Sequence, residues 1–232
     1  MIDVEHLHIR QGAFRLDDVS LHIPRGKYAL LMGKTGCGKT TILEAIAGLR
    51  SIGAGVIRLN DREVTHLSPA GREIGYVPQD GALFRTMTVR DNLGFALKLR
   101  ALPARAIKER VEQLADWLGV RPLLDRRAVG LSGGEAQRIA LGRALANHPP
   151  ILLMDEPLSS LDEETRDRMI ELLKGLPQRE SVTVLHITHS RHEADQLGEW
   201  IFRLQEGRIE VIKAQGAPSE NITESRPQDR ST

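Results

Sequence analysis

The sequence predicts an α/β fold, in which a sheet core carries an N-terminal antiparallel β-subdomain and an inserted helical subdomain. Three observations lead to this prediction. The first third of the chain contains short alternating or apolar segments, the middle has apolar residues at helical spacing, and the last third alternates helix and strand patterns. The length of 232 residues suits one domain with a subdomain.

The first third is predicted to be mostly strand. Val4 to Ile9 alternates apolar and polar residues, and Tyr28 to Met32 is a short apolar run typical of a buried strand that ends at a glycine loop. Further strands are predicted over Leu21 to Ile23, Gly55 to Asn60 and Ile74 to Val77.

The middle of the chain is predicted to be helical. Candidate helices cover Thr88 to Arg100 and Ala104 to Gly119, and the second has one apolar face, made by Ile107, Val111, Leu114 and Leu118. Pro103 precedes this second helix, where proline is tolerated, and Gly119 is suited to end it. The helical subdomain is therefore expected at about residues 86–146.

The last third alternates between strand and helix patterns. Strands are predicted over Ile151 to Met154 and Val182 to Ile187, with a helix over Leu161 to Leu173 between them. Trp200 to Leu204 and Arg208 to Ile212 flank a turn and predict a terminal hairpin. Residues 1–213 are expected to form a single domain, and the polar, proline-containing residues 214–232 a disordered tail.

Composition excludes several classes of function. The 32 basic and 31 acidic residues nearly cancel, and aromatic residues make up only 3%, so a nucleic-acid partner is not expected. No window approaches the roughly twenty apolar residues of a membrane helix, and the charged N-terminus does not resemble a signal peptide. We expect a soluble chain whose role at a membrane is peripheral. The single cysteine, Cys37, excludes an internal disulfide.

The clearest local motif is GKTGCGKT, which follows the apolar run ending at Met32 and leads into a helix pattern. This context predicts a P-loop NTPase core, in which glycines let backbone N–H groups point at the phosphates of ATP. Lys39 is expected to contact the β- and γ-phosphates, and the Thr40 hydroxyl to bind Mg²⁺. A glycine turn with a chance lysine is the weaker alternative. The predicted ATP-binding residues are Gly33, Lys34, Thr35, Gly36, Cys37, Gly38, Lys39, Thr40 and Thr41.

Two acids end the apolar strand pattern in ILLMDEP. Asp155 is predicted to hold Mg²⁺, directly or through water, and Glu156 to polarise the attacking water in phosphoryl transfer. Alone this pattern is weak, because acids often cap helices. The preceding P-loop favours the catalytic interpretation.

Between these motifs lies LSGGEAQRIALGRAL, residues 131–145, in which a Ser-Gly-Gly-Glu turn opens a helix. Ser132 and the N–H groups of Gly133 and Gly134 form a second candidate anion site at a helix N-terminus. The LSGGE segment resembles the signature of ATP-binding cassette (ABC) proteins, and with the other motifs the resemblance covers Ile2 to about Lys213. It implies the ABC ATPase fold.

The resemblance also implies a shared site. Two cassettes of this family dimerise head to tail, so Ser132, Gly133, Gly134 and Glu135, with Asp162 of the D-loop-like SSLD, are expected to contact the ATP of a second subunit, most simply in a homodimer. Gln79 resembles the Q-loop glutamine near Mg²⁺ and the attacking water, and His189 resembles the switch histidine that senses the γ-phosphate. Phe14 is the candidate for stacking on adenine, with a core position as the equal alternative.

The segment Tyr76 to Leu93 resembles importer ATPase subunits for oxyanions, polyamines or sugars. The resemblance implies transport, most simply import, with integral-membrane permease subunits that contact Ala82, Leu83, Phe84 and Met87 at the cytoplasmic face of the membrane. A substrate-binding protein is a further possible partner. Many such subunits have an extra C-terminal β-domain, for which this sequence is too short. Alternatives to an importer subunit are the ATPase of an exporter or of a lipoprotein-release complex, and an ATP-gated regulator. A cassette that acts on nucleic acid is not expected, because such cassettes have long insertions or two tandem cassettes, and this sequence has neither.

Overall fold

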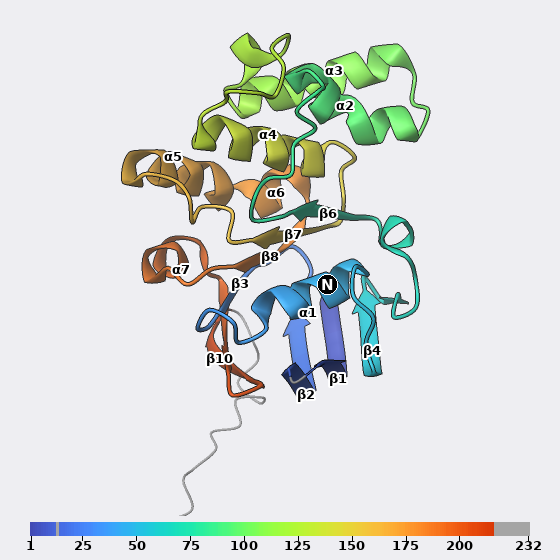
Figure 1. Ribbon diagram of the computed structural model, residues 1–232, viewed down its shortest axis with the longest axis vertical. Helices are drawn as coiled ribbons and strands as arrows, with labels where there is room; N and C mark the ends of the chain where they lie inside the picture. Colours follow the sequence, from blue (N-terminus) through green and yellow to red (C-terminus); the bar gives the residue numbers. More distant parts are fainter. Residues whose placement is uncertain (13, 216–232) are drawn as a thin grey trace, which may run out of the picture.

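The computed structural model describes residues 1–12 and 14–215, and its central element is a six-stranded sheet (Figure 1). The strand order is β10-β9-β3-β8-β7-β6, and every neighbouring pair is parallel except β9 and β10. The strands are β3 (Tyr28–Met32), β6 (Ile74–Val77), β7 (Ile151–Asp155), β8 (Thr183–Ile187), β9 (Trp200–Gln205) and β10 (Arg208–Ala214). Strands β7 and β8 are buried along their whole length, which explains their continuous apolar sequences.

A second, antiparallel sheet has the order β2-β1-β4-β5, from β1 (Ile2–Gln11), β2 (Phe14–Ile23), β4 (Ala54–Leu59) and β5 (Arg62–Glu63). Strand β2 begins seven residues before the predicted segment at Leu21. Register shifts interrupt the β1–β2 pairing twice, around His6 in β1 and between Leu16 and Val19 in β2, where Asp18 has a φ of 60°. Such a bulge breaks the two-residue period that identifies a strand in the sequence.

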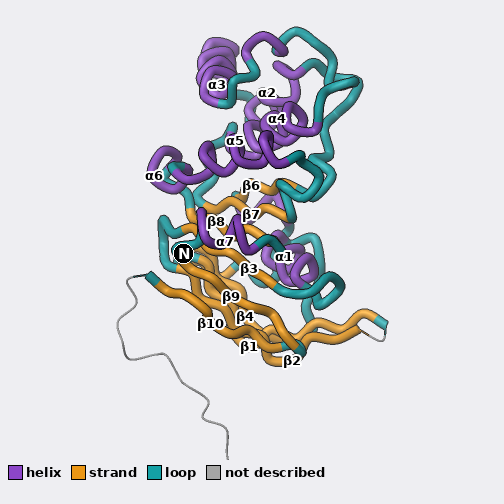
Figure 2. The backbone as a smooth tube through the Cα atoms, turned by 90° about the vertical axis from the view of Figure 1, so that its left-hand side faces the viewer, coloured by secondary structure: helices purple, strands orange, loops and turns teal. Residues whose placement is uncertain are grey.

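Helix α1 (Lys39–Ala47) lies between the two sheets (Figure 2). Its residues Ile42, Leu43 and Ile46 are fully buried and belong to a core cluster that also contains residues of both sheets. Burial from two sides at once anchors the start of this helix firmly against the sheet.

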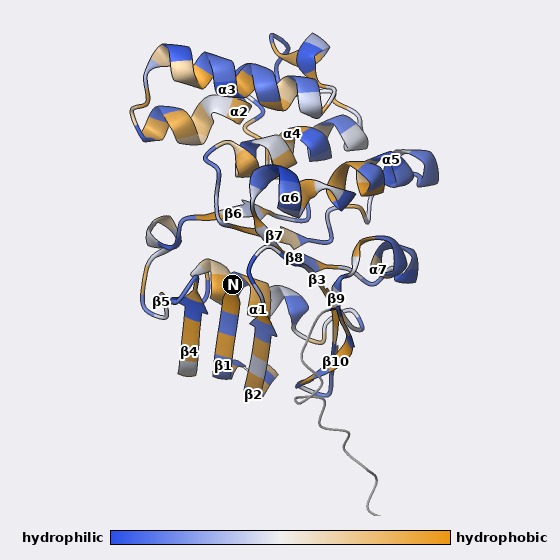
Figure 3. Cartoon of the chain, turned by 180° about the vertical axis from the view of Figure 1, so that it is seen from behind, coloured by the Kyte–Doolittle hydropathy of each residue, from blue (hydrophilic) through white to orange (hydrophobic). Residues whose placement is uncertain are grey.

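The other face of the parallel sheet is covered by helices (Figure 1). They are α2 (Val89–Leu99), α3 (Ala104–Trp117), α4 (Gly133–Leu145), α5 (Glu163–Lys174), α6 (Leu176–Glu180) and α7 (Arg191–Leu197), with a 3₁₀ turn at Arg121–Leu123. A second 3₁₀ turn, Pro69–Arg72, lies against α1, where Arg72 donates hydrogen bonds to the carbonyl oxygens of Ala45 and Ile46. Hydrophobic segments, in orange, lie along the strands and alternate with hydrophilic ones, in blue, along the helices (Figure 3). Leu93 and Val111 of α2 and α3 share one core cluster with Leu152 and Met154 of β7, so the helical segment packs continuously onto the sheet.

Most predicted elements are confirmed, with small corrections. The predicted tail includes two residues that the structure places against the rest of the chain: Ala214 pairs with Trp200 in the β9–β10 hairpin, and the Gln215 N–H donates a hydrogen bond to the Glu199 carbonyl oxygen. Residues 216–232, where the rest of that prediction falls, lie outside the described residues. Within the described part of the chain, no helix combines the length and apolarity needed to cross a lipid bilayer. The limits of the helical subdomain and of the single domain stay predictions.

Candidate nucleotide site

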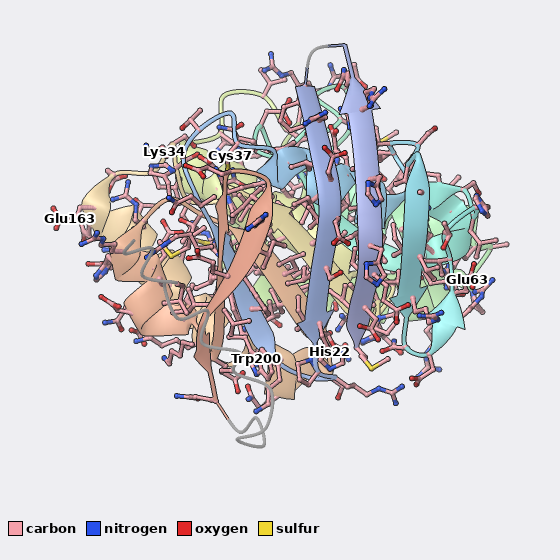
Figure 4. The ribbon with its side chains drawn as sticks, turned by 90° about the horizontal axis from the view of Figure 1, so that it is seen from below. His22, Lys34, Cys37, Glu63, Glu163 and Trp200 are labelled. Atoms are coloured by element: carbon pink, nitrogen blue, oxygen red, sulfur yellow. The ribbon has the colours of Figure 1, made fainter. Side chains whose placement is uncertain are left out.

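The predicted site residues follow the carboxyl ends of four parallel strands. The glycine loop follows β3, Gln79 follows β6, Glu156 follows β7 and His189 follows β8. These strands are joined in one sheet, so their carboxyl ends meet at a single edge. Figure 4 shows Lys34 and Cys37 side by side at this edge, at the end of the molecule opposite Trp200 and His22.

The glycine loop is folded around the lysine that ends it. Lys39 is buried, and its Nζ donates hydrogen bonds to the carbonyl oxygens of Gly33 at 3.0 Å and Lys34 at 2.9 Å. Gly38 has a φ of 109°, and a Cβ there would lie 2.6 Å from the Phe14 ring. Only glycine satisfies both conditions, so the loop geometry depends on it.

Asp155 ends β7 beneath this loop and is buried. The Thr40 hydroxyl donates a hydrogen bond of 3.2 Å to Asp155 Oδ1. Burial raises the pKa of Asp155 above its usual value, and the charges of Glu156 and Glu44 add to this, although the Thr40 bond and Lys39 oppose it. A hydroxyl and a carboxylate oxygen at this separation are the donors that Mg²⁺ prefers, so the residues fit that ion.

Glu156 adopts a backbone conformation that is uncommon for residues other than glycine. Its φ is 44°, and its N–H donates a hydrogen bond of 3.0 Å to the carbonyl oxygen of Ile187 on β8. The carboxylate is mostly buried, and its Oε2 lies 3.2 Å from Nδ1 of His189, whose side chain is 60% exposed. Strained conformations of this kind are concentrated at functional sites.

One hollow joins the predicted phosphate loop with residues from three other segments. It has a volume of about 460 Å³ and is lined by Gln11, Phe14, Thr35, Gly36, Gly38, Lys39, Thr40, Thr41, Gln79 and Glu156. The structure thus brings Phe14, Gln79 and Glu156 to the glycine loop, as the sequence predicts. Gln11 was missed, because nothing in its local sequence distinguishes it from any exposed strand residue.

The LSGGE turn lies elsewhere. Ser132 Oγ accepts from the Glu135 N–H at 3.2 Å, and Glu135 Oε2 accepts from the Ser132 N–H at 2.7 Å, which makes a capping box at the start of α4. Neither residue lines the hollow at the glycine loop. Ser132 and Gly133 are exposed, so the start of α4 lies at the surface of this chain.

The D-loop-like segment packs against that turn. A Cβ on Gly134 would lie 2.4 Å from Thr165 Cγ2, so glycine is needed for α4 to approach α5 this closely. Asp162 caps α5, because its Oδ1 accepts from the Thr165 N–H at 2.9 Å. Asp162 and the LSGGE turn therefore belong to one surface, separate from the glycine loop.

Two further residues of the structure hold the segment after Gln79 and were not predicted. Arg143 of α4 donates hydrogen bonds to the carbonyl oxygens of Gly81 and Ala82, and Asn92 of α2 bonds both backbone groups of Phe84. Asn92 is fully buried. A polar residue within the apolar pattern of a helix is the one sequence signal that pointed to Asn92.

The family is shown by a match over residues 16–159 to the model described as ABC transporter. The chain belongs to the ABC transporter family. The resemblance stated from the motifs and the predicted ABC ATPase fold are both confirmed.

Curated relatives of the chain include proteins whose names describe them as import ATP-binding proteins. The chain is 42% identical over 84% of its length to the molybdate/tungstate import ATP-binding protein WtpC of Thermococcus kodakarensis, covering 59% of that protein. It is 44% identical over 93% of its length to the sulfate/thiosulfate import ATP-binding protein CysA 2 of Chromobacterium violaceum, covering 60% of it. The chain thus spans about three-fifths of the length of the curated relatives it matches.

Solved structures agree with the fold. A dimeric ATP-binding cassette in a post-hydrolysis state, bound to ADP and Pi, has a TM-score of 0.83 at 28% identity, and the match covers 94% of this chain and all of the other. A second dimeric structure, of a bacterial ABC transporter cassette, also has a TM-score of 0.83, at 29% identity.

Proposed function

We propose that this chain binds and hydrolyses ATP as the energy-supplying subunit of an ABC importer. The observation that carries the proposal is the hollow where the Lys39 loop, Gln79 and Glu156 meet at one sheet edge. The import names of the relatives and the ADP-bound and Pi-bound neighbour support it.

The roles within the site follow from the contacts. The loop N–H groups and Lys39 bind the phosphates, and Lys39 exchanges its two backbone carbonyl partners for phosphate oxygens. Thr40 and Asp155 would hold Mg²⁺, with Gln79 lining the same hollow as Thr40, and the ion would neutralise charge on the phosphates. Glu156 accepts a proton from the attacking water, while His189 holds its carboxylate in place. Phe14 covers one wall and contacts the adenine.

We propose a homodimer in which each nucleotide lies between the Lys39 loop of one copy and the LSGGE turn of the other. Within one chain these elements are on different surfaces, and the capping box leaves the N-terminus of α4 facing outward. Ser132, Gly133 and Asp162 share that outward surface, whereas Gly134 is buried against α5. The dimeric state of the two structural neighbours supports this arrangement.

We propose that a permease binds beside the Gln79 segment. Of the four predicted contacts, Ala82 and Phe84 are exposed, while Leu83 and Met87 are half-buried, with Leu83 packed against the core. A groove of about 530 Å³ lies next to them, lined in part by Phe84, Phe95, Leu99, Arg100 and Arg143. An amphipathic segment of a membrane subunit fits such an apolar groove.

Leu99 tests the permease surface, because it lines the groove and is 73% exposed. Leu99→Arg is expected to reduce copurification of membrane subunits at least about tenfold, since it places charge in the groove. ATP hydrolysis by the isolated subunit should not change. Ile212→Arg, on the exposed face of β10, is the matched control. Equal recovery of membrane subunits with Leu99→Arg and Ile212→Arg contradicts this surface.

The remaining assignments are part of the same proposal. The subunit lies at the cytoplasmic face of the membrane, held by the permease, and a substrate-binding protein delivers the transported molecule. Residues 1–213 form one domain with a helical subdomain at about 86–146. The second candidate function is that of an exporter or lipoprotein-release ATPase. It is less favoured than import, because the relatives are named import ATP-binding proteins.

A further inference from the structure

A buried polar cluster lies beneath the loop that carries His189. It contains Tyr28 of β3, His186 of β8 and Glu193 of α7, all of which are buried. The Tyr28 hydroxyl is 2.9 Å from Nδ1 of His186, and Nε2 of His186 is 3.4 Å from Oε2 of Glu193. That second separation is an ion-pair distance, and Nε2 has no hydrogen-bond partner among the described residues.

The charges in the cluster are set by its contacts. Burial raises the pKa of Tyr28 well above its ordinary value, so its hydroxyl remains a donor. When Tyr28 donates to Nδ1, the proton of a neutral His186 is on Nε2 and points toward Glu193. Burial alone raises the pKa of Glu193, but His186, the Thr188 hydroxyl and the charge of Arg166 outweigh this, so the pKa lies below its usual value. Glu193 is therefore a buried carboxylate.

Stability alone does not account for such a cluster. Replacing buried charged groups with apolar residues of similar volume is often neutral or stabilising. The sheet face around His186 is otherwise apolar, with Leu30, Leu152 and Val184 in the same core cluster. A buried charged group beside a reaction site is more often connected with function.

Glu193 reaches the reaction site directly. It lines a hollow of about 230 Å³ together with Glu156, His189 and Arg166. Its N–H donates to Ser190 Oγ at 3.3 Å, and the Ser190 N–H donates to Thr188 Oγ1 at 3.0 Å. The Glu193 carboxylate is itself linked to this turn by the Thr188 hydroxyl, one of the groups that lower its pKa. Thr188, directly before His189, is therefore held by the Glu193 side chain, and Ser190, directly after it, is bonded to Thr188.

We propose that Glu193, supported by His186 and Tyr28, is a positioning residue that keeps His189 against the Glu156 carboxylate during hydrolysis. This inference rests on the proposed ATP hydrolysis. Glu193 acts through the turn at residues 188–190 and not by contact with nucleotide. Its loss is expected to slow the chemical step without changing nucleotide affinity.

The test compares Glu193→Gln with Asp195→Asn, which changes an exposed acid on the same helix. Glu193→Gln is expected to lower kcat for Mg-ATP at least about tenfold and to leave KM within about twofold. Asp195→Asn is expected to match the wild type. If the wild-type protein releases no phosphate, the proposed function is contradicted. If the wild type is active and the kcat of Glu193→Gln is within about twofold of the wild-type kcat, this inference is overturned.

An apolar double variant separates positioning from stability. His186→Phe combined with Glu193→Leu removes the buried carboxylate and the imidazole and replaces them with apolar side chains of similar volume, so it is expected to fold and bind Mg-ATP while kcat stays low. If this variant instead recovers wild-type kcat, the cluster is structural and the inference is wrong. If Glu193→Gln does not bind nucleotide, Tyr28→Phe is the variant to measure, because it removes only one hydroxyl from the cluster. A fall of about threefold in kcat at unchanged KM supports the positioning role of the cluster. An unchanged kcat overturns that role.

Discussion

Glu156→Gln is expected to lower the rate of ATP hydrolysis by about 10²- to 10⁴-fold, the range typical for loss of a positioned general base. The amide has nearly the same shape as the carboxylate but cannot accept the proton of the attacking water. Bound ATP is then not consumed, so the closed dimer should accumulate. Phosphate release and size-exclusion chromatography with Mg-ATP measure both effects.

Glu171→Gln is the control for this variant, because Glu171 is an exposed acid on α5 that pairs with Lys174 at the surface. It should hydrolyse ATP at the wild-type rate. If Glu156→Gln remains monomeric with ATP and releases phosphate normally, Glu156 is not the base.

Lys39→Ala is expected to weaken Mg-ATP binding by about ten- to a hundredfold, since a charge-assisted hydrogen bond contributes roughly 1.5–3 kcal/mol. In the structure the ammonium already faces the inside of the loop and bonds two carbonyl oxygens there. Isothermal titration with a slowly hydrolysed ATP analogue measures the affinity.

Lys34→Ala is the matched control in the same loop. The Lys34 side chain is exposed, and its expected contribution to phosphate binding is through the backbone. The affinity of the Lys34→Ala variant for the ATP analogue should remain within about threefold of the wild-type affinity. Unchanged affinity in Lys39→Ala, or equal loss in both variants, contradicts the assigned role of Lys39.

The predictable parts of the fold are those with a strong local pattern. The apolar strand at Tyr28 to Met32 and the amphipathic helix ending near Gly119 both appear where the sequence indicates. Strand β2 was placed too short because an extra residue between Leu16 and Val19, where Asp18 has a φ of 60°, disturbs its own alternation. Helices α6 and α7 have five and seven residues, which is too short for a helical period to be recognised.

The site was predictable as a set of motifs, but its internal contacts were not. Motif spacing indicated Lys39, Asp155 and Glu156, because phosphate and metal chemistry requires those residue types in local order. The contact between Glu156 and His189 joins the ends of two strands, and sequence alone gives no distance between them. His186 was assigned no role, since only the tertiary structure places Glu193 and Tyr28 beside it.

The central claim is that each ATP is bound by two copies of the chain, and mixing two inactive variants tests it most directly. Lys39→Ala disables the phosphate loop, and Ser132→Arg blocks the LSGGE turn with a large charged side chain. In a mixed dimer, the intact loop of the Ser132→Arg copy faces the intact turn of the Lys39→Ala copy, so one complete site forms.

The measurement is the rate of phosphate release from the two variants alone and from their equimolar mixture. With random pairing and independent sites, the mixture should recover about a quarter of the wild-type rate, because half of the dimers contain one intact site of two. A mixture that releases phosphate no faster than the mean of the two separate variants, although mixed dimers are present, would contradict the shared site.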